Sequence, residues 1–276
     1  MWAIVPVAAA PGRIQLLAGG AASAAPAAAG FDDQAAADYL LERLLRAGAT
    51  RLCFVIAPNQ THLLGKFGGS IGFAHVCYTV QPQARGLCDA IFSALPFMHA
   101  DEEVIVGPLD SVWFPEDALC ALPRGVLSFL LFPAQSEEDP SVVMDDFGFV
   151  REIRTQTPSL RGAWTWRAFK APVRVLRELH TLWLRRERRD GEFETLANEH
   201  FRRGGRARGV RAGTSYLRVD AAIDRREALR LLTRAEQEQA VDIAPYLEPE
   251  RAGVWALGRA QPLPPPGNNP TSPSAA

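Results

Sequence analysis

Short apolar segments alternate with amphipathic segments through the first 130 residues, and this alternation constrains the fold more than any other feature of the sequence. The apolar runs are β-branched or aromatic, as is typical of buried strands, and the intervening segments have helical periodicity. Strands joined through helices pair in parallel, because the connecting helix returns the chain to the same end of the sheet. The pattern predicts an α/β sheet with helices on both faces. The predicted strands are 2–8, 52–57, 75–80, 104–107 and 125–132, and the predicted helices are 33–47, 59–67 and 86–95.

The second part of the chain has a different pattern. Asp145-Asp146-Phe147-Gly148 has the composition of a turn between two short apolar runs and predicts a hairpin. Residues 163–169 and 208–219 predict further strands, the latter as a pair or a bent strand, and helices are expected to begin at Pro172, Glu192 and Arg226. We therefore expect one domain over residues 1–235 and a C-terminal extension over 236–276, disordered from about residue 260, where the sequence becomes Pro-rich and polar.

Composition and charge exclude several classes of protein. Hydrophobic residues make up 47% and charged residues 22% of the 276 residues, the balance of a soluble globular protein. The net charge of −1 lacks the basic excess of a nucleic-acid binder, so no nucleic-acid partner is expected. No apolar stretch reaches the roughly 20 residues of a membrane helix. The apolar start of the chain lacks a basic flank and is interrupted by Pro6, which favours a first strand over a signal peptide and a cytoplasmic location.

The cysteines and histidines predict neither a metal site nor a disulfide framework. No C-x-x-C pair is present, and each cysteine lies in an apolar run, so buried thiols are expected. The histidines have no metal-ligand spacing and are expected at the surface or the edge of the core. The cysteines are Cys53, Cys77, Cys88 and Cys120, and the histidines are His62, His75, His99, His180 and His200.

Five segments, in order along the chain, carry a resemblance to one enzyme family. The clearest are the helix and strand 39–56, which begin Tyr39-Leu40-Leu41-Glu42-Arg43, and the segment 81–91, which begins Gln81-Pro82-Gln83-Ala84-Arg85-Gly86. The other segments are 104–110, 147–153 and 213–228. Together they resemble the sugar-1-phosphate nucleotidylyltransferases, in particular the glucose-1-phosphate thymidylyl- and uridylyltransferases. The resemblance implies a Rossmann-like, mixed and mostly parallel sheet. It also implies a reaction in which a nucleoside triphosphate and a sugar 1-phosphate give a nucleotide sugar and pyrophosphate.

The resemblance assigns roles to five residues of this sequence. Arg13 matches the catalytic arginine of the family's phosphate loop, and Gly12 lies where that loop has its threonine. Gln81 matches the glutamine that reads the nucleobase, and Gly86 the glycine that lets the base approach the backbone. Asp110 matches an aspartate that ligates Mg²⁺ at the end of a strand. The residues alone leave alternatives open: Gln81 as a solvated strand end, Gly86 as a helix start, and Asp110 as the cap of a turn.

At other positions the sequence departs from the family. Ala9 and Pro11 replace loop glycines, which impairs a backbone cradle for phosphate, because alanine resists positive φ and proline lacks an N–H. A Pro-Lys pair is expected near Ala25-Pro26, but no lysine is present there. The family's Glu-Lys-Pro becomes Gln156-Thr157-Pro158, which loses both the carboxylate and the ammonium group. Nearby Arg154 does not substitute for the lysine, because its planar guanidinium differs from a compact ammonium. Lys170 is expected at a helix surface and does not substitute either. Arg218 falls where a second metal-binding aspartate belongs, with Asp220 two residues beyond it.

These departures predict a divergent member of the family with weak or lost activity. If it is active, Mg²⁺ is the expected cofactor, and a nucleoside triphosphate and a sugar 1-phosphate are the expected partners. The alternative is a non-catalytic module, a pseudoenzyme that binds nucleotides or nucleotide sugars. The sequence leaves open a homo-oligomer.

Overall fold

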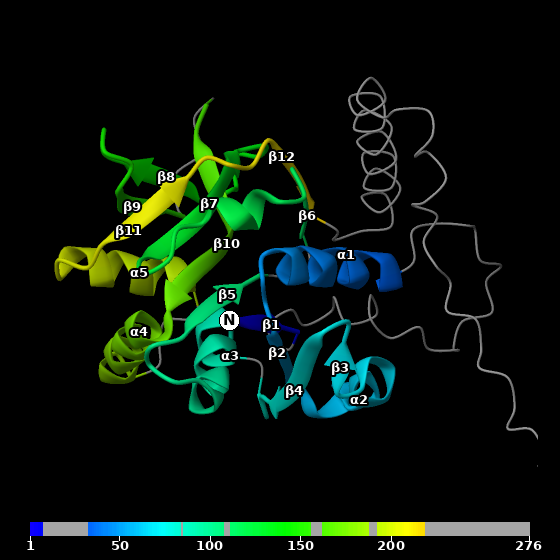
Figure 1. Cartoon of the computed structure of the whole chain (residues 1–276). Coiled ribbons are helices and arrows are strands. Elements are labelled where there is room, and N and C mark those ends of the chain that lie inside the picture. The colour runs from blue at the N-terminus through cyan, green and yellow to red at the C-terminus, as the bar shows by residue number, and fades with distance from the viewer. Residues whose placement is uncertain (8–32, 84, 108–110, 156–161, 188–191, 219–276) are drawn as a thin grey trace, which may run out of the picture. The chain divides into compact units, whose positions relative to one another are not determined.

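An eight-stranded mixed sheet forms the centre of the computed structural model, which describes residues 1–7, 33–83, 85–107, 111–155, 162–187 and 192–218 (Figure 1). Its strands are β1 (Trp2–Pro6), β2 (Arg51–Ile56), β3 (Ser70–Ile71), β4 (Ala74–Val80), β5 (Glu103–Val106), β7 (Leu127–Pro133), β10 (Trp164–Pro172) and β11 (Ala207–Val210). They lie in the order β11-β7-β10-β5-β1-β2-β4-β3. Strands β5, β1, β2 and β4 form a continuous parallel block, and β11 is parallel to β7. The predicted fold class, a Rossmann-like and mostly parallel α/β sheet, is confirmed.

Strand β10 departs from the rule that successive strands are parallel. It runs antiparallel to both of its neighbours, β5 and β7. The chain enters β10 from the hairpin of β8 (Ser141–Met144) and β9 (Val150–Arg154), and the residues described between this hairpin and β10, which exclude 156–161, form no helix. A connection without a crossover helix has no need to return to the starting end of the sheet, so antiparallel pairing follows. The short antiparallel β3 at the sheet edge was likewise not predicted.

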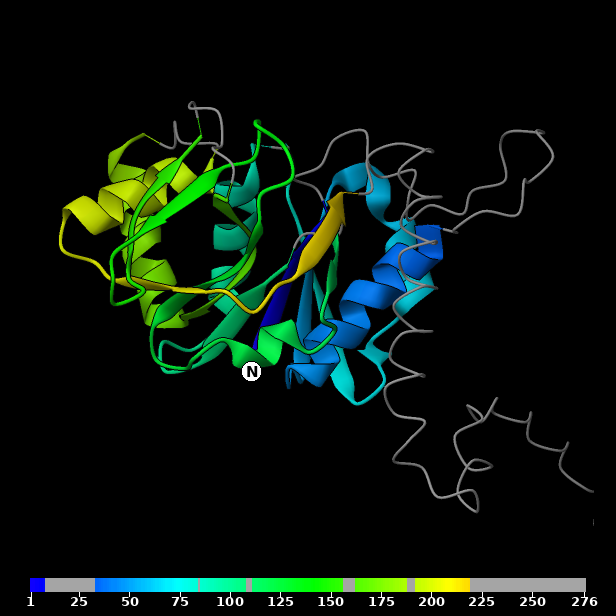
Figure 2. The same ribbon diagram turned by 90° about the horizontal axis from the view of Figure 1, so that it is seen from above.

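Helices cover both faces of the sheet and bury two apolar layers (Figure 2). One layer holds side chains of α3 (Leu87–Ala94), α4 (Val173–Arg185) and α5 (Phe193–Arg202). The other layer holds side chains of α1 (Asp33–Arg46) and α2 (His62–Phe67). Because both faces are covered, the strands of the parallel block are mostly apolar, and all five residues of β1 are buried. The predicted helix before Gly48 is confirmed as α1, and Gly48 follows it with φ 89°, the left-handed conformation common after a helix end.

A smaller two-stranded sheet joins distant parts of the chain. Strand β6 (Ser111–Phe114) pairs antiparallel with β12 (Ser215–Arg218), about a hundred residues later. The segment 208–219, predicted as a pair or a bent strand, therefore divides between two sheets, with β11 in the large sheet and β12 in the small one. Strand β6 was not predicted. The helix expected at Arg226 and the C-terminal extension lie outside the described residues, so the domain boundary stays a prediction.

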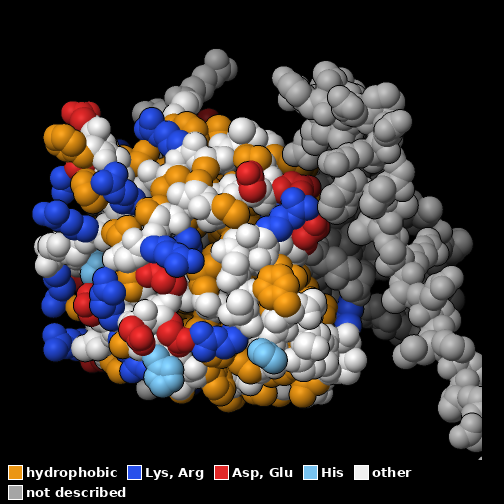
Figure 3. Space-filling model, in the orientation of Figure 1, with side chains coloured by type: hydrophobic (Ala, Val, Ile, Leu, Met, Phe, Trp, Pro, Cys, Tyr) orange, Lys and Arg blue, Asp and Glu red, His pale blue; other side chains and the backbone are white. Residues whose placement is uncertain are grey.

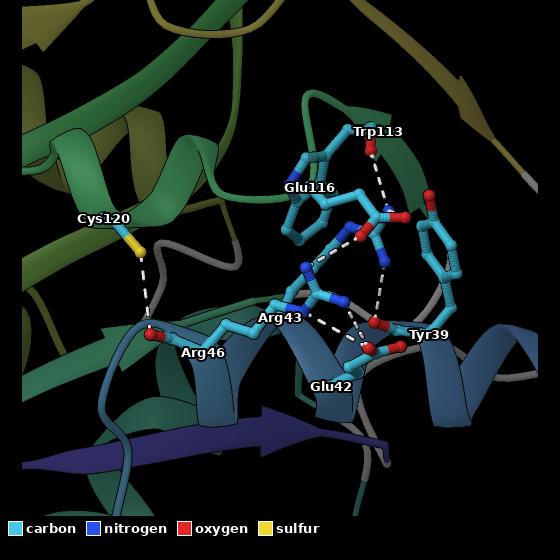
Figure 4. Close-up of polar contacts among 7 residues, drawn as sticks. All are labelled: Tyr39, Glu42, Arg43, Arg46, Trp113, Glu116 and Cys120. Atoms are coloured by element: carbon cyan, nitrogen blue, oxygen red, sulfur yellow. Dashed lines mark hydrogen bonds and ion pairs between the residues drawn. The ribbon is translucent and has the colours of Figure 1, made fainter. Parts of the chain in front are cut away.

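A buried arginine holds β6 against α1 (Figure 4). The guanidinium of Arg43 donates to the carbonyl oxygens of Tyr39 (3.0 Å) and Trp113 (3.2 Å), and only 1% of the residue is exposed. The Glu116 carboxylate is 3.9 Å away and also pairs with Arg46 at 3.0 Å. Burial lowers the pKa of Arg43 to about 9, because the distant carboxylate compensates little of the lost hydration. Arg43 thus links α1 to β6, the strand that begins at Ser111.

Charged side chains lie mainly over the second part of the chain. Figure 3 shows Lys and Arg gathered on the side of α4, α5 and β11, with acidic side chains between them. Arg202 and Arg203, at the end of α5, both pair with Glu199. Among the described residues, no helix is both long and apolar enough to cross a membrane.

The cysteines only partly follow the prediction of buried thiols. All four are free; Cys53 and Cys88 are buried and Cys77 is half-buried. Cys120 is exposed, which corrects the prediction. Cys120 belongs to the 3₁₀ helix Ala118–Ala121, in which Ala118 and Leu119 are buried and Cys120 faces outward. Its thiol lies 3.6 Å from the carbonyl oxygen of Arg46.

Candidate functional site

Gln81 lies at the carboxyl end of β4, at the edge where the parallel strands β1, β2, β4 and β5 all end. Open α/β sheets bind ligands at this edge. The residue is only 1% exposed, which excludes the reading of Gln81 as a solvated strand end. Its backbone N–H donates to the carbonyl oxygen of Ile56 at 2.8 Å and extends the β2–β4 ladder by one bond. The sheet therefore fixes the position of this side chain.

The amide of Gln81 is oriented by Asp89. The amide nitrogen Nε2 donates to the Asp89 carboxylate at 2.5 Å, and an ionised carboxylate can only accept, so the orientation of the amide is determined. Asp89 lies in the first turn of α3, where the helix dipole favours a negative charge. The other end of the amide, Oε1, is buried and accepts no hydrogen bond from any described residue. A buried carbonyl without a donor is costly, so this oxygen is suited to a ligand N–H.

Gly86 immediately precedes α3 and has φ 93°, a conformation that residues with a Cβ rarely adopt. A side chain at this position would strain the turn that leads from β4 into α3. The structure therefore supports the reading of Gly86 as a helix-start residue. Its approach to a nucleobase stays a prediction.

The other predicted site residues lie outside the described part of the chain. These are Gly12, Arg13 and Asp110, and the departures at Ala9, Pro11, Ala25 and 156–158 lie there as well. Arg218 is the last residue of β12, and its backbone pairs with that of Ser111, which follows Asp110 in sequence. The expected proximity of position 218 to the proposed metal-binding segment thus agrees with the strand pairing. Among the described residues, no group of three or more His, Cys, Asp or Glu side chains could hold a metal ion.

A cavity of about 170 Å³ lies beside the start of α3. It is bounded by the first residue of α3, the last residue of β5 and the first residue of β6, so it lies at the same edge of the sheet as Gln81. Its opposite wall comes from β10, α5 and the segment before β8. The lining residues are Leu87, Val106, Ser111, Pro140, Trp166, Arg167 and Glu194.

A β-bulge in β10 aims two neighbouring side chains at this cavity. Trp166 pairs with Leu131 and Ala168 with Leu130, so Arg167 is an extra residue without a partner in the ladder. In a regular strand, consecutive side chains point to opposite faces, but a bulge changes this alternation. Trp166 and Arg167 can therefore both line the cavity. The indole of Trp166 also packs on Phe129 and Phe193 (ring centroids 5.6 and 5.9 Å), which holds it rigidly.

The charge of Arg167 is compensated by a buried network. Its Nη2 donates to Asp139 at 2.5 Å, and its guanidinium stacks on the Tyr216 ring at 4.0 Å. The Tyr216 hydroxyl and the backbone N–H groups of Gln135 and Ser136 also donate to Asp139. Burial by itself raises the pKa of Asp139, but the Tyr216 and Ser136 hydrogen bonds and the Arg167 charge outweigh it and lower the pKa. The buried Nε of Arg167 has no acceptor among the described residues.

Glu194 is the third polar group of the cavity. It lies in the first turn of α5, and burial is the main cause that raises its pKa, with a further contribution from the charge of Glu192. A backbone hydrogen bond at Glu194 and the Arg167 charge oppose this shift. The cavity thus combines an aromatic wall, a carboxyl group that retains its proton at higher pH than usual, and a neutralised arginine. Such a lining suits a hydroxylated, uncharged group better than a free phosphate.

Lys170 does not lie at a helix surface, which corrects the prediction. It belongs to β10, is 4% exposed, and donates from Nζ to the carbonyl oxygen of Leu122 at 2.7 Å. Burial lowers its pKa. The strand continues three residues beyond the predicted end at 169, to Pro172, and carries Lys170 into the interior between β5 and β7. The lysine therefore serves as an internal anchor and cannot serve the cavity.

The residues of this cavity were not predicted from the sequence. One available signal was Arg167, a charged residue inside an apolar strand pattern. The others become neighbours only through the fold: Asp139 lies in a loop, Glu194 on a helix, and Tyr216 near the end of the described chain.

Comparisons with known proteins support the fold. No family model and no curated protein sequence matches the chain. A Bacillus anthracis protein assigned as a glucose-1-phosphate thymidylyltransferase, solved with sucrose, is similar with TM-score 0.62 and 13% identity, over 84% of this chain and 95% of that one. A UDP-glucose pyrophosphorylase complexed with UDP-glucose has TM-score 0.63 and 10% identity, over 85% and 98%. The inositol-1-phosphate CTP transferase of T. maritima has TM-score 0.59 and 14% identity, over 81% and 90%. At this low identity the likeness shows the fold alone: the chain has the Rossmann-like α/β fold of these nucleotidyltransferases.

Proposed function

We propose that this protein binds a nucleoside triphosphate with its base at Gln81 and transfers the nucleotidyl group to a sugar 1-phosphate, at a low rate. The products are a nucleotide sugar and pyrophosphate. The observation that carries the proposal is the amide of Gln81, which is buried at the ligand-binding edge of the sheet, oriented by Asp89, and left with one unpaired oxygen. This oxygen would accept an N–H from a nucleobase. Near neutral pH every nucleobase offers at least one N–H donor. The amide alone therefore does not select among bases.

The cavity next to Gly86 would hold the sugar. Leu87 follows Gly86 directly and lines the cavity, so a base at Gln81 and a sugar in the cavity would be neighbours. An indole face suits the apolar side of a sugar ring, and Glu194 would hydrogen-bond with ring hydroxyls. Pairing with Asp139 neutralises Arg167, so the phosphate of the sugar would lie outside the cavity, toward the nucleotide. The solved structures of similar fold carry names that include glucose 1-phosphate, inositol 1-phosphate and UDP-glucose, which is consistent with a ligand of this class.

A low rate follows from the missing cations and loop glycines. The chain has two lysines: Lys170 is buried and donates to Leu122, and Lys66 lies on α2 with its ammonium 5.6 Å from the Phe67 ring centroid. Loss of one transition-state contact typically costs about 3–4 kcal/mol of activation free energy. Arg13 would be the remaining cation of the phosphate loop, and Mg²⁺ at Asp110 remains an expectation.

The same facts favour a second function, a non-catalytic module that binds nucleotides or nucleotide sugars. The base and sugar subsites need no lysine, whereas transfer of a phosphoryl-linked group requires charge neutralisation. Binding can therefore persist in a chain that no longer catalyses the transfer. Turnover distinguishes the two functions.

Calorimetry tests nucleotide binding. We expect at least one of UTP, dTTP, CTP, ATP and GTP, titrated with Mg²⁺ present, to bind. Replacement of Gln81 by leucine should weaken nucleotide affinity about tenfold or more, because an unpaired N–H donor on the base costs about 1–3 kcal/mol. Gln83→Leu is the matched control, since Gln83 is two residues away and exposed. Equal affinities of the two variants would contradict the assignment of Gln81.

Pyrophosphate release tests transfer. Purified protein incubated with Mg²⁺, the bound nucleotide and glucose 1-phosphate should release pyrophosphate slowly, and Asp110→Ala should abolish the release. Nucleotide binding with no release above the Asp110→Ala background would leave the binding module as the function. Binding of no nucleotide and no nucleotide sugar would reject both functions.

A further inference from the structure

Two cysteines face each other across adjacent parallel strands. Cys53 of β2 and Cys77 of β4 are direct partners in the ladder, so their side chains project from the same face of the sheet. Both pack against the apolar layer that contains α3. Neighbouring strands are about 4.8 Å apart. This separation lies within the range of about 4.4–6.8 Å between the Cα atoms of a disulfide.

The two thiols differ in exposure and in reactivity. Cys77 is half-buried, whereas Cys53 has no exposed surface. The neighbouring Cys77 thiol together with burial raises the pKa of Cys53, and the neighbouring Cys53 thiol lowers the pKa of Cys77. Thiolates are the reactive form of cysteine. Cys77 is thus the accessible nucleophile and Cys53 its buried neighbour.

We propose that Cys77 and Cys53 form a peroxide-reactive dithiol, in which Cys77 is oxidised first and Cys53 closes a reversible disulfide. In the first step the Cys77 thiolate attacks one oxygen of hydrogen peroxide, the O–O bond breaks, and Cys77 becomes a sulfenic acid while hydroxide leaves and takes up a proton to form water. In the second step the sulfur of Cys53 attacks the sulfenic sulfur. The S–O bond breaks, and the hydroxyl leaves with the Cys53 proton as a second water. Peroxide is the oxidant of the whole sequence, and a dithiol reductant reverses it.

The disulfide would act on the proposed nucleotide subsite through the β2–β4 ladder. The ladder runs from the Cys53–Cys77 pair to the Ile56–Val80 pair and ends at the bond from Gln81 N–H to Ile56. A covalent link changes the side-chain separation three residues before this end, on the face covered by α3. We expect oxidation to weaken nucleotide binding. This consequence rests on the proposed function, whereas formation of the disulfide does not.

Mass spectrometry of the full chain tests the dithiol without any nucleotide. The Cys120→Ser variant serves as the background, because Cys120 is the exposed thiol among the described residues. After brief treatment with hydrogen peroxide we expect a mass lower by two hydrogens, a peptide map that links Cys53 to Cys77, and full reversal by dithiothreitol. In the same background, Cys53→Ala should leave a Cys77 sulfenic acid that dimedone traps. Cys77→Ser should show neither product.

Several results would overturn the proposal. These are a bridge that involves Cys88, over-oxidation of Cys77 with no bridge, or no reaction of Cys77 at peroxide concentrations that oxidise Cys120 in the wild-type chain. Circular dichroism of each variant checks that it is folded, and a conservative Cys53→Ser variant repeats the trapping result if Cys53→Ala unfolds. Calorimetry with the bound nucleotide, on reduced and oxidised protein, measures the consequence separately. A failure of nucleotide binding in the reduced protein would therefore reject the proposed function and leave the dithiol result intact.

Discussion

The two sides of the large sheet differ in the side chains that fill them and in the charges that they bury. The parallel block of β5, β1, β2 and β4 is filled mostly by aliphatic side chains, with the rings of Phe54 and Tyr78 stacked among them, and Gln81 directly follows β4. The side built from β7, β10 and β11 is filled by aromatic rings and carries charges within its interior, at Arg167 and Lys170. The parallel block therefore supplies a rigid frame with a ligand edge. The antiparallel side supplies the shape and polarity of a cavity, and its stability depends on completed polar networks.

The largest expected effect is at the buried ion pair of the antiparallel side. Asp139→Asn should destabilise the protein by about 3–5 kcal/mol, because it leaves the charge of Arg167 buried without a counter-charge. Glu152→Gln is the matched control, since it removes the acid of an exposed pair with Arg154 and should cost less than about 1 kcal/mol. Urea unfolding followed by circular dichroism measures both. Similar losses in the two variants would mean that the buried network contributes no more than a surface pair.

Replacement of glycine by alanine should change stability in opposite directions at two positions, one in β11 and one in α2, the helix that follows β2. A Cβ at Gly209 of β11 would meet the sulfur of Met144 at 2.2 Å, so Gly209→Ala should destabilise by about 1–3 kcal/mol. Gly65 of α2 has no atom within 4 Å of the Cβ position, so Gly65→Ala should stabilise by about 0.5–1 kcal/mol through helix propensity. Thermal unfolding of both variants checks the pair. Stabilisation by Gly209→Ala would show that β11 packs more loosely than described.

Arg43 tests whether every buried charge in this protein is needed. Its carboxylate neighbour is distant, and its pKa is lowered to about 9, so Arg43→Met should be neutral or stabilising by up to about 2 kcal/mol near neutral pH. The unfolded chain binds this proton more tightly than the folded protein. Any advantage of the methionine variant should therefore shrink as pH rises above about 9. A large loss of stability in denaturant unfolding would instead assign a structural role to the hydrogen bonds with Tyr39 and Trp113.

Glu194 should give the smallest effect, visible as a pH dependence. Its pKa is raised in the folded protein above the ordinary value of 4.5, so the folded state binds the proton more tightly. The contribution of Glu194 protonation to the free energy of unfolding is fully present below pH 4.5. It is lost as the pH rises from there through the raised pKa. The difference in unfolding free energy between wild type and Glu194→Gln, measured from pH 4 to 8, should change in this direction. A difference independent of pH would place Glu194 in contact with water.

The parallel block could be predicted from sequence because its signals are local. The strand before Gln81, the turn at Gly86 and the helix that carries Asp89 are contiguous, so periodicity and turn residues define all three. The cavity could not be predicted in this way. The bulge that places Arg167 beside Trp166 leaves no pattern in the sequence, and β6 and β12 have four residues each and pair across about a hundred residues. The antiparallel direction of β10 was likewise not predicted, because it depends on pairing with β5 and β7, which are distant in sequence.

The hydroxyl of Tyr216 completes the Asp139 network from the last strand of the described chain. Every strand of the large sheet precedes it in sequence, so a nascent chain emerging from a ribosome can assemble the sheet before this residue is available. During that interval Asp139 and Arg167 lack their aromatic cover. A chain truncated before residue 215 would therefore keep every strand of the large sheet but lack the Tyr216 hydroxyl on Asp139 and the Tyr216 ring on Arg167.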